Sequence, residues 1–201
     1  MRFSALHAVA AVLVSSAMLS GCDVRSHKGL DGDRVNIGTP FGSLHVNKDR
    51  EADVAALGIT AYPGATPLKN DDDTSAANVS LSIGSVHLGV RSARFQTAES
   101  VNKVLSFYRN DLKRYGTVIQ CQKGHAVGSP KRTEQGLSCS EQAHHDSGAY
   151  TFDFDSDLAL LTGSPQHQHV VTLSQHDGGT KIELIALDLP QHHSDLDDDS
   201  E

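Results

Sequence analysis

The chain has 201 residues, of which 21% are charged and 38% hydrophobic, and its formal net charge is −8 at pH 7. This length suits one domain, and the composition excludes a polytopic membrane protein, a collagen-like chain and a wholly disordered chain. The acidic excess argues against a nucleic-acid partner, because phosphate binding relies on clustered Lys and Arg.

The first 21 residues predict a cleaved lipoprotein signal peptide. Arg2 supplies a short positive region, and the apolar run from Ala8 to Val14 is too short to cross a bilayer as a helix. The stretch ends in Leu19-Ser20-Gly21-Cys22, which resembles the lipobox of bacterial lipoproteins. The resemblance implies a covalent lipid on the Cys22 thiol, with further acylation of the freed amine giving a stable anchor. The alternative is an ordinary secretory signal followed by an unrelated cysteine.

The residues after Cys22 predict how the protein sits in the envelope. Asp23 resembles the signal that retains lipoproteins in the inner membrane, with the domain on the periplasmic side; the outer membrane is the alternative. Residues 22–33 are polar and contain glycine, so we expect a flexible lipidated tether.

Alternating apolar and polar residues predict two hairpins in the first half of the chain. One covers residues 34–49 with a turn at 39–42, and the other joins residues 78–83 to 86–90 and buries one face. Between them we expect a short helix over residues 51–57 and a type II turn at Tyr62-Pro-Gly-Ala65.

The strongest local pattern predicts an amphipathic helix over residues 98–115. Thr97 is the expected N-cap and Gly116 the residue that ends the helix. One apolar stripe at helical spacing needs a partner, and a one-sided sheet is the obvious one. The stripe consists of Val101, Val104, Leu105, Tyr108, Leu112 and Tyr115.

The second half of the chain predicts further strands, at residues 117–121, 137–141, 149–154, 170–174 and 181–187. One main helix among successive strands, without βαβ alternation, favours the α+β class. We expect a mainly antiparallel sheet with one long amphipathic helix packed on one face. The domain covers residues 34–190, and residues 191–201 form a disordered acidic tail.

Cys121 and Cys139 form an even pair in an oxidising compartment, which predicts a disulfide. Closing a loop of this size contributes about 3 kcal/mol to stability. The alternative is a redox-active or metal-binding dithiol, for which no CxxC spacing is present.

Several short motifs resemble a family of uncharacterised bacterial envelope lipoproteins. They are Tyr62-Pro-Gly-Ala65, the helix pattern FYxxxLxxxG that ends at Gly116, Gly163-Ser-Pro and Asp177-Gly-Gly-Thr-Lys181. The resemblance spans residues 34–189. It implies one exported α+β domain and brings no established activity with it.

No catalytic motif such as GxSxG, HExxH or a P-loop occurs, so we expect no enzyme and no cofactor beyond the lipid on Cys22. The expected function is a non-catalytic binding or structural module of the cell envelope, held at the membrane and contacting an envelope protein.

The alternative is periplasmic metal binding through clustered histidines, because imidazole binds zinc, copper and nickel. The candidate ligands are His144, His145, His167, His169, His192 and His193. Solvent-exposed histidines are the favoured interpretation, since a specific site needs three or four converging ligands.

Overall fold

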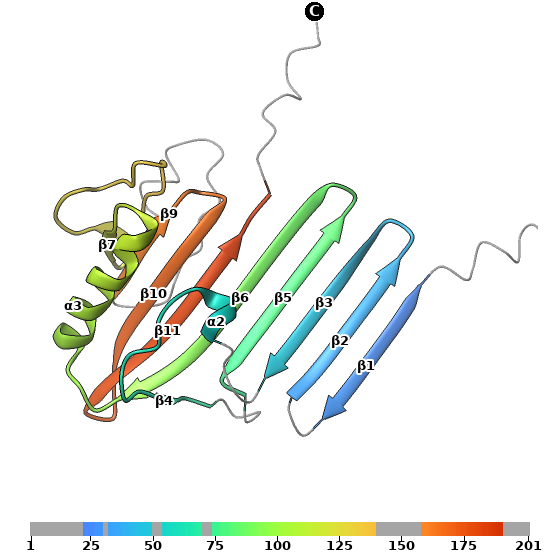
Figure 1. The fold of residues 1–201 in the computed structure, drawn as a ribbon, viewed down its shortest axis with the longest axis horizontal. Coiled ribbons are helices and arrows are strands. Elements are labelled where there is room, and N and C mark those ends of the chain that lie inside the picture. Colours follow the sequence, from blue (N-terminus) through green and yellow to red (C-terminus); the bar gives the residue numbers. More distant parts are fainter. Residues whose placement is uncertain (1–21, 30–31, 50–53, 70–73, 140–157, 191–201) are drawn as a thin grey trace, which may run out of the picture.

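The computed structural model describes residues 22–29, 32–49, 54–69, 74–139 and 158–190 (Figure 1). The strands are β1 (Asp23–Gly29), β2 (Gly32–Thr39), β3 (Gly42–Asp49), β4 (Thr66–Pro67), β5 (Ala76–Ile83), β6 (Val86–Thr97), β7 (Ile119–Gln122), β8 (His125–Ala126), β9 (Leu158–Gly163), β10 (His167–His176) and β11 (Gly179–Asp188). The helices are α2 (Val54–Leu57), α3 (Val101–Asp111) and the 3₁₀-helix η2 (Leu112–Tyr115).

The strands form a single sheet whose order is β1-β2-β3-β5-β6-β11-β10-β9-β7-β8, with β4 paired to β6. Adjacent strands pair antiparallel, so the expectation of a mainly antiparallel sheet is confirmed. Helices α2 and α3 lie over the half of the sheet that contains β6 and β9–β11 (Figure 1). Among the residues described, no helix is long and apolar enough to span a membrane.

The half of the sheet under α3 is covered on both faces. On the helix side, a buried cluster joins Val104, Tyr108 and Leu112 to inward-facing strand residues such as Leu173 and Leu184. On the opposite face, a second cluster forms around the cysteine pair. Its members are Ile119, Cys121, Leu137, Cys139, Ala159, Leu161, Val170, Ile185, Leu187 and Leu189. Burial of apolar side chains on both faces makes this half the stable body of the fold.

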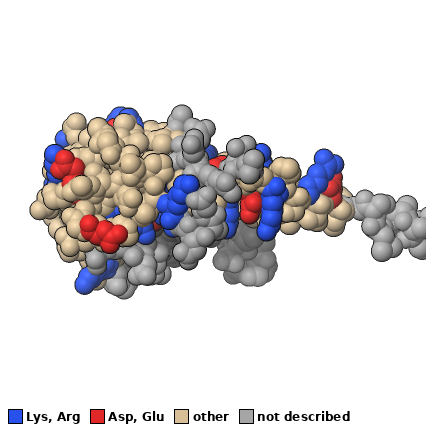
Figure 2. All heavy atoms as spheres, turned by 90° about the horizontal axis from the view of Figure 1, so that it is seen from below, with Lys and Arg blue, Asp and Glu red and all other residues tan. Residues whose placement is uncertain are grey.

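The other half, formed by β1, β2, β3 and β5, is a single layer that the described helices leave uncovered. Figure 2 shows the molecule thick over α3 and thin toward β1. Its strands alternate, so Val35, Val46, Val79 and Val90 stand side by side on one face. The other face carries polar side chains. Cross-strand neighbours pair there: His45 Nδ1 lies 2.6 Å from Asn36 Oδ1, and Ser82 Oγ lies 2.9 Å from His87 Nδ1.

The predicted flexible tether at residues 22–33 is wrong in its larger part. Asp23–Gly29 forms β1, whose seven residues pair with β2 from Asp23↔Gly38 to Gly29↔Gly32. The side chains of β1 are almost all exposed. β1 is held in the sheet by its backbone hydrogen bonds to β2 rather than by burial of side chains. Its sequence therefore shows no alternation of apolar and polar residues, which is the pattern by which strands are recognised. The sheet therefore begins at Asp23 rather than at residue 34.

The helix predicted over residues 98–115 is present but shorter, since helical structure covers Val101–Tyr115 and starts three residues later than expected. Its α-helical part is the eleven residues Val101–Asp111, after which η2 tightens the chain. Ser100, with ψ 150°, is the N-cap in place of Thr97. The Thr180 hydroxyl donates a 2.7 Å hydrogen bond to the Glu99 carbonyl and holds that residue outside the helix. The apolar stripe nevertheless packs on the sheet as expected.

The remaining expectations after the helix are met unevenly. β10 and β11 confirm the two strands at 170–174 and 181–187, and β7 overlaps 117–121. Of the strand expected at 137–141, the described residues 137–139 make only an isolated bridge, between Ser138 and Arg132, and residues 140–141 lie outside the described part. The strand expected at 149–154 and the tail at 191–201 lie outside the described residues, and β9 was not anticipated.

Candidate functional site

Cys22 directly precedes β1, and its side chain is exposed and free of any disulfide. Strand register fixes its surroundings: Asp23 pairs with Gly38, so Cys22 lies beside the turn between β2 and β3. The predicted lipidation residue is thus accessible, at one end of the sheet and next to a hairpin turn.

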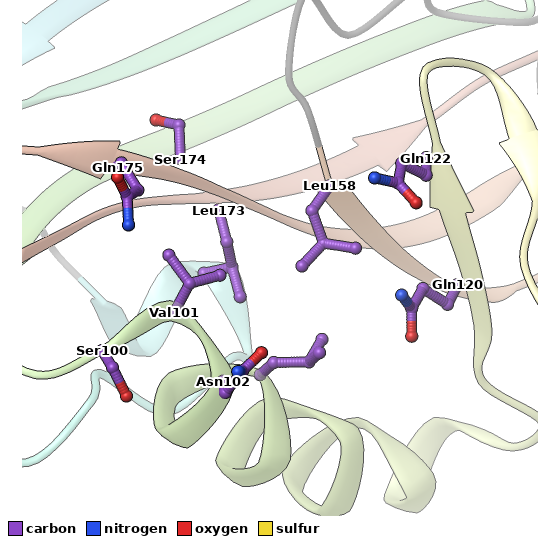
Figure 3. A pocket seen from close by; sticks show the side chains of 10 residues that line it. Ser100, Val101, Asn102, Gln120, Gln122, Leu158, Leu173, Ser174 and Gln175 are labelled. Carbon is purple, nitrogen blue, oxygen red and sulfur yellow. The ribbon is translucent and has the colours of Figure 1, made fainter.

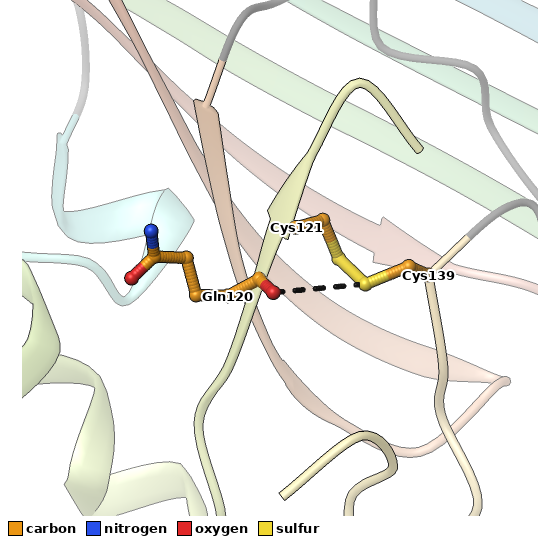
Figure 4. Close-up of a disulfide and its surroundings, with 3 residues drawn as sticks. All are labelled: Gln120, Cys121 and Cys139. Atoms are coloured by element: carbon orange, nitrogen blue, oxygen red, sulfur yellow. Dashed lines mark hydrogen bonds between the residues drawn. A yellow bond between two sulfur atoms is a disulfide. The ribbon is translucent and has the colours of Figure 1, made fainter. Parts of the chain in front are cut away.

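The other two cysteines form the disulfide that their number predicted (Figure 4). Cys121 on β7 and Cys139 have Cα atoms 5.8 Å apart, and both side chains are buried in the cluster opposite α3. The Cys139 Sγ lies 3.9 Å from the carbonyl oxygen of Gln120. This is a packing contact, because a disulfide sulfur has no proton to donate. The disulfide ties the segment that follows β8 to the sheet.

The histidine candidates do not converge in the described part of the chain. His167 and His169 share one face of β10, but His167 Nδ1 lies 3.1 Å from Asp188 Oδ1 at the surface, whereas His169 is packed against Tyr115. In the residues described, no group of three or more His, Cys, Asp or Glu could hold a metal ion. His144, His145, His192 and His193 lie outside the described residues, so metal binding stays a prediction.

His169 occupies the most unusual electrostatic environment of these residues. Its ring stacks on Tyr115 at a centroid distance of 3.8 Å, and its Nδ1 is buried with no hydrogen-bond partner. Burial lowers the pKa of His169 below its ordinary value; the nearby Asp188 carboxylate opposes this effect, and Arg114, Arg91 and His167 add to it. The Tyr115 hydroxyl donates to the Gly58 carbonyl rather than to His169. The pair therefore lacks the hydrogen bond by which an imidazole activates a nucleophile.

Two arginines around this histidine hold loops onto the sheet and helix. Arg114 donates a 2.6 Å hydrogen bond to the Gly58 carbonyl and pairs with Asp111 at 3.0 Å. Arg91 pairs with Asp188 and donates a 2.8 Å hydrogen bond to the Ala56 carbonyl in α2. None of these residues belongs to a sequence motif that predicts a site. The one indication in the sequence is that Arg91 is charged, whereas the residues before it in β6 are not. Its partners lie far away in the chain, so the sequence does not predict the contacts.

A pocket of about 450 Å³ opens between the start of α3 and strands β7, β9 and β10 (Figure 3). Its walls combine aliphatic side chains with amides and hydroxyls. They are Ser100, Val101, Asn102, Leu105, Gln120, Gln122, Leu158, Leu173, Ser174 and Gln175. None of these described lining residues is an acid, a base or a thiol. The pocket can therefore offer hydrogen bonds and apolar contacts. Among these lining residues the hydroxyls of Ser100 and Ser174 are the potential nucleophiles, and none of the others could act as their general base.

Comparison of the chain with models of protein families, with curated proteins and with solved structures found no match.

Proposed function

We propose that this protein is a lipoprotein of the bacterial cell envelope, anchored by acyl chains on Cys22, whose periplasmic domain is a non-catalytic binding or structural module. The observation that carries the proposal is that the three cysteines differ in burial and in bonding. Cys121 and Cys139 are buried in a disulfide, whereas Cys22 is free and exposed where the lipobox-like Leu19-Ser20-Gly21 ends.

Two further features support this proposal. A structural disulfide is typical of proteins that fold in an oxidising compartment such as the periplasm. Two or three acyl chains on one residue give stable anchoring, since each buried methylene contributes about 0.8 kcal/mol. A domain tethered in this way needs no membrane-spanning helix of its own.

The experiment is metabolic labelling with an alkyne-bearing fatty acid, followed by mass spectrometry of the N-terminal peptide. We expect label on the protein and a mature chain that begins at acylated Cys22. The C22S variant should lose the label and accumulate with its signal segment uncleaved. The C121S/C139S double variant, which removes the other two cysteines, is the matched control and should keep the label. An unacylated Cys22, or a chain continuous through Gly21–Cys22, contradicts the proposal.

The inner membrane is the proposed location, on the ground that Asp23 follows Cys22. Density-gradient separation of inner and outer membranes tests this, with D23S as the comparison. We expect wild-type protein with the inner membrane and a shift of D23S toward the outer one. Wild-type protein found in the outer membrane contradicts the assignment of the membrane but not that of the anchor.

A further inference from the structure

Large apolar side chains that are exposed gather at one end of the sheet. Among the described residues, five large hydrophobic side chains are exposed, and four of them are Val24 (63%), Phe41 (82%), Ile83 (54%) and Val86 (49%). We call these four the tip patch. Phe41 lies in the turn between β2 and β3, and Ile83 and Val86 flank the turn between β5 and β6. Isolated exposed apolar residues need no explanation, but a cluster at one end does.

Strand register places the tip patch at the end of the sheet that holds Cys22. Asp23 pairs with Gly38, Gly42 pairs with Ile83, and Ile83 pairs with Val86. The start of β1 and the two hairpin turns therefore stand side by side, as Figure 1 shows at the upper right of the sheet. A lipid attached to Cys22 would extend from the edge of the sheet, at one end of the row that these four side chains form.

In the two hairpins, charge is distributed along the same axis, whereas on β1 the exposed Asp23 and Arg25 flank Val24 and form an ion pair with each other. Residues 35–47 and 74–90, which make up both hairpin tips, include no Asp, Glu, Lys or Arg. The opposite end of these strands carries Lys28 beside Asp33 and Asp33 beside Lys48. Figure 2 looks onto that opposite end and shows Lys, Arg, Asp and Glu side chains spread across it. Uncharged turns with apolar side chains can enter the headgroup region at little cost, whereas charged ones resist it.

The Phe41 turn is built to hold its side chain outward. The Thr39 hydroxyl accepts hydrogen bonds from the backbone amides of Phe41 (3.3 Å) and Gly42 (3.0 Å). A Cβ on Gly42 would lie 2.3 Å from the Ser82 carbonyl, so glycine lets β3 approach β5 closely at this point. The turn is thus fixed against its neighbour while Phe41 stays in solvent.

We infer that the tip patch inserts into the outer part of the lipid bilayer beside the anchored Cys22, so that the sheet stands end-on to the membrane. This inference rests on the proposed lipid anchor, and it adds an orientation and a protein–lipid contact. The anchor determines that the protein is held at the membrane, and the tip patch determines which end of the sheet meets the lipid.

The absence of tryptophan from the sequence makes a direct test possible. F41W and V86W each create a single fluorescent reporter, one in each hairpin. Full-length variants are purified with their natural processing and reconstituted into vesicles of phosphatidylethanolamine and phosphatidylglycerol, with or without lipids brominated on their acyl chains. We expect blue-shifted emission from both reporters and quenching by the brominated lipids several-fold stronger than in the control.

The matched control is V127W, at the fifth exposed hydrophobic residue. The backbone amide of Val127 donates a hydrogen bond to the carbonyl of Gln120. Across the sheet, the strand register aligns Gln120 with Ala76, which lies at the opposite end of β5 from Ile83. Val127 is therefore remote from the tip patch along the strand direction. Thermal unfolding of each variant establishes that the fold is intact. We expect it to be, because all three substituted side chains are exposed.

Mass spectrometry of the same samples separates this inference from the proposed function. If Cys22 is acylated but either tip reporter is quenched no more than V127W, the inference is overturned and the anchor stands. If Cys22 is unmodified, the proposed anchor fails, and the reporters are read after adding the protein to preformed vesicles. Quenching of both reporters then still supports the tip patch as a lipid-binding surface, and its absence overturns the inference as well.

Discussion

The imidazole ring of His169 lies flat on the phenol ring of Tyr115, with ring centroids 3.8 Å apart and an angle of 11° between the planes. The two residues come from β10 and from the end of η2, so the contact holds the end of the helical segment to the sheet. Because Nδ1 is buried without a partner, the neutral ring suits this site better than the charged one.

The first prediction follows from this burial. The pKa of His169 is lowered in the folded protein, so the unfolded chain binds a proton there at a higher pH than the folded chain does. Stability is therefore unaffected well above a pH of about 6.5 and falls as the pH drops through that value toward the lowered pKa. H169F keeps a ring on Tyr115 and cannot be protonated, so it should lose less stability between about pH 7.5 and about pH 5.5.

Urea unfolding at the two pH values measures this difference. H87Q is the matched control, because His87 is exposed on β6 and is not among the groups that shift the pKa of His169. It should retain the wild-type dependence on pH. Equal losses of stability in H169F and the wild type would contradict a neutral His169 with a buried Nδ1.

The disulfide gives the second prediction. Replacing both cysteines in C121S/C139S should lower the free energy of unfolding by about 3 kcal/mol, because the unfolded chain regains the freedom of the closed loop. Urea denaturation of the wild type with and without reductant gives an independent value. The reduced wild type and the double variant should agree; a reduced protein as stable as the oxidised one would contradict a structural role.

The third prediction compares the two halves of the sheet by matched leucine substitutions. Leu184 is fully buried beneath the helices, and L184A should cost about 2–5 kcal/mol because it leaves a cavity. Leu81 is partly exposed in the single-layer half, where solvent fills the space, and L81A should cost about 1 kcal/mol. Chemical denaturation measures both. Similar costs would indicate that the single-layer half is covered in solution.

Hydrogen exchange supplies the fourth prediction. The amides of β10 and β11 lie between two buried clusters and should exchange only when the whole domain unfolds. Those of β1, β2 and β3, whose side chains are mostly half-buried or exposed, should exchange at lower opening free energies. Mass spectrometry of peptic fragments follows both sets. Equal protection across the sheet would contradict a fold with one stable body and one thin extension.

The sequence predicts strands well where each strand has one apolar and one polar face. β2, β3 and β5 show this alternation, and they were found at the expected places. β9 is apolar on both faces, with Leu160 in the cluster under α3 and Leu161 in the opposite one, so it has no alternation to detect. β1 fails for the opposite reason, because it is polar on both faces.

The residues of the candidate site were likewise predictable where the information is local in the sequence, and not where it depends on contacts between distant positions. Cys22 and the Cys121–Cys139 pair depend on a short motif and on the number of cysteines, both of which can be read directly from the sequence. The contact between Tyr115 and His169, and the ion pair between Arg91 and Asp188, join positions far apart in the chain. The tip patch likewise needs the strand register, since Val24, Phe41 and Ile83 become neighbours only in the folded sheet.

β1 starts one residue after Cys22, which leaves almost no slack in the chain between an acyl anchor and the folded domain. A longer linker would let the domain sweep through a wide volume, whereas one peptide unit reaches only about 3.5 Å. With strands rising roughly 3.4 Å per residue, the eight residues of β5 span roughly 25 Å. Held end-on, the charged far end of the sheet would stand at a constant height above the lipid. Any partner that meets it must reach down to that level, and the domain would then work as a spacer of set length.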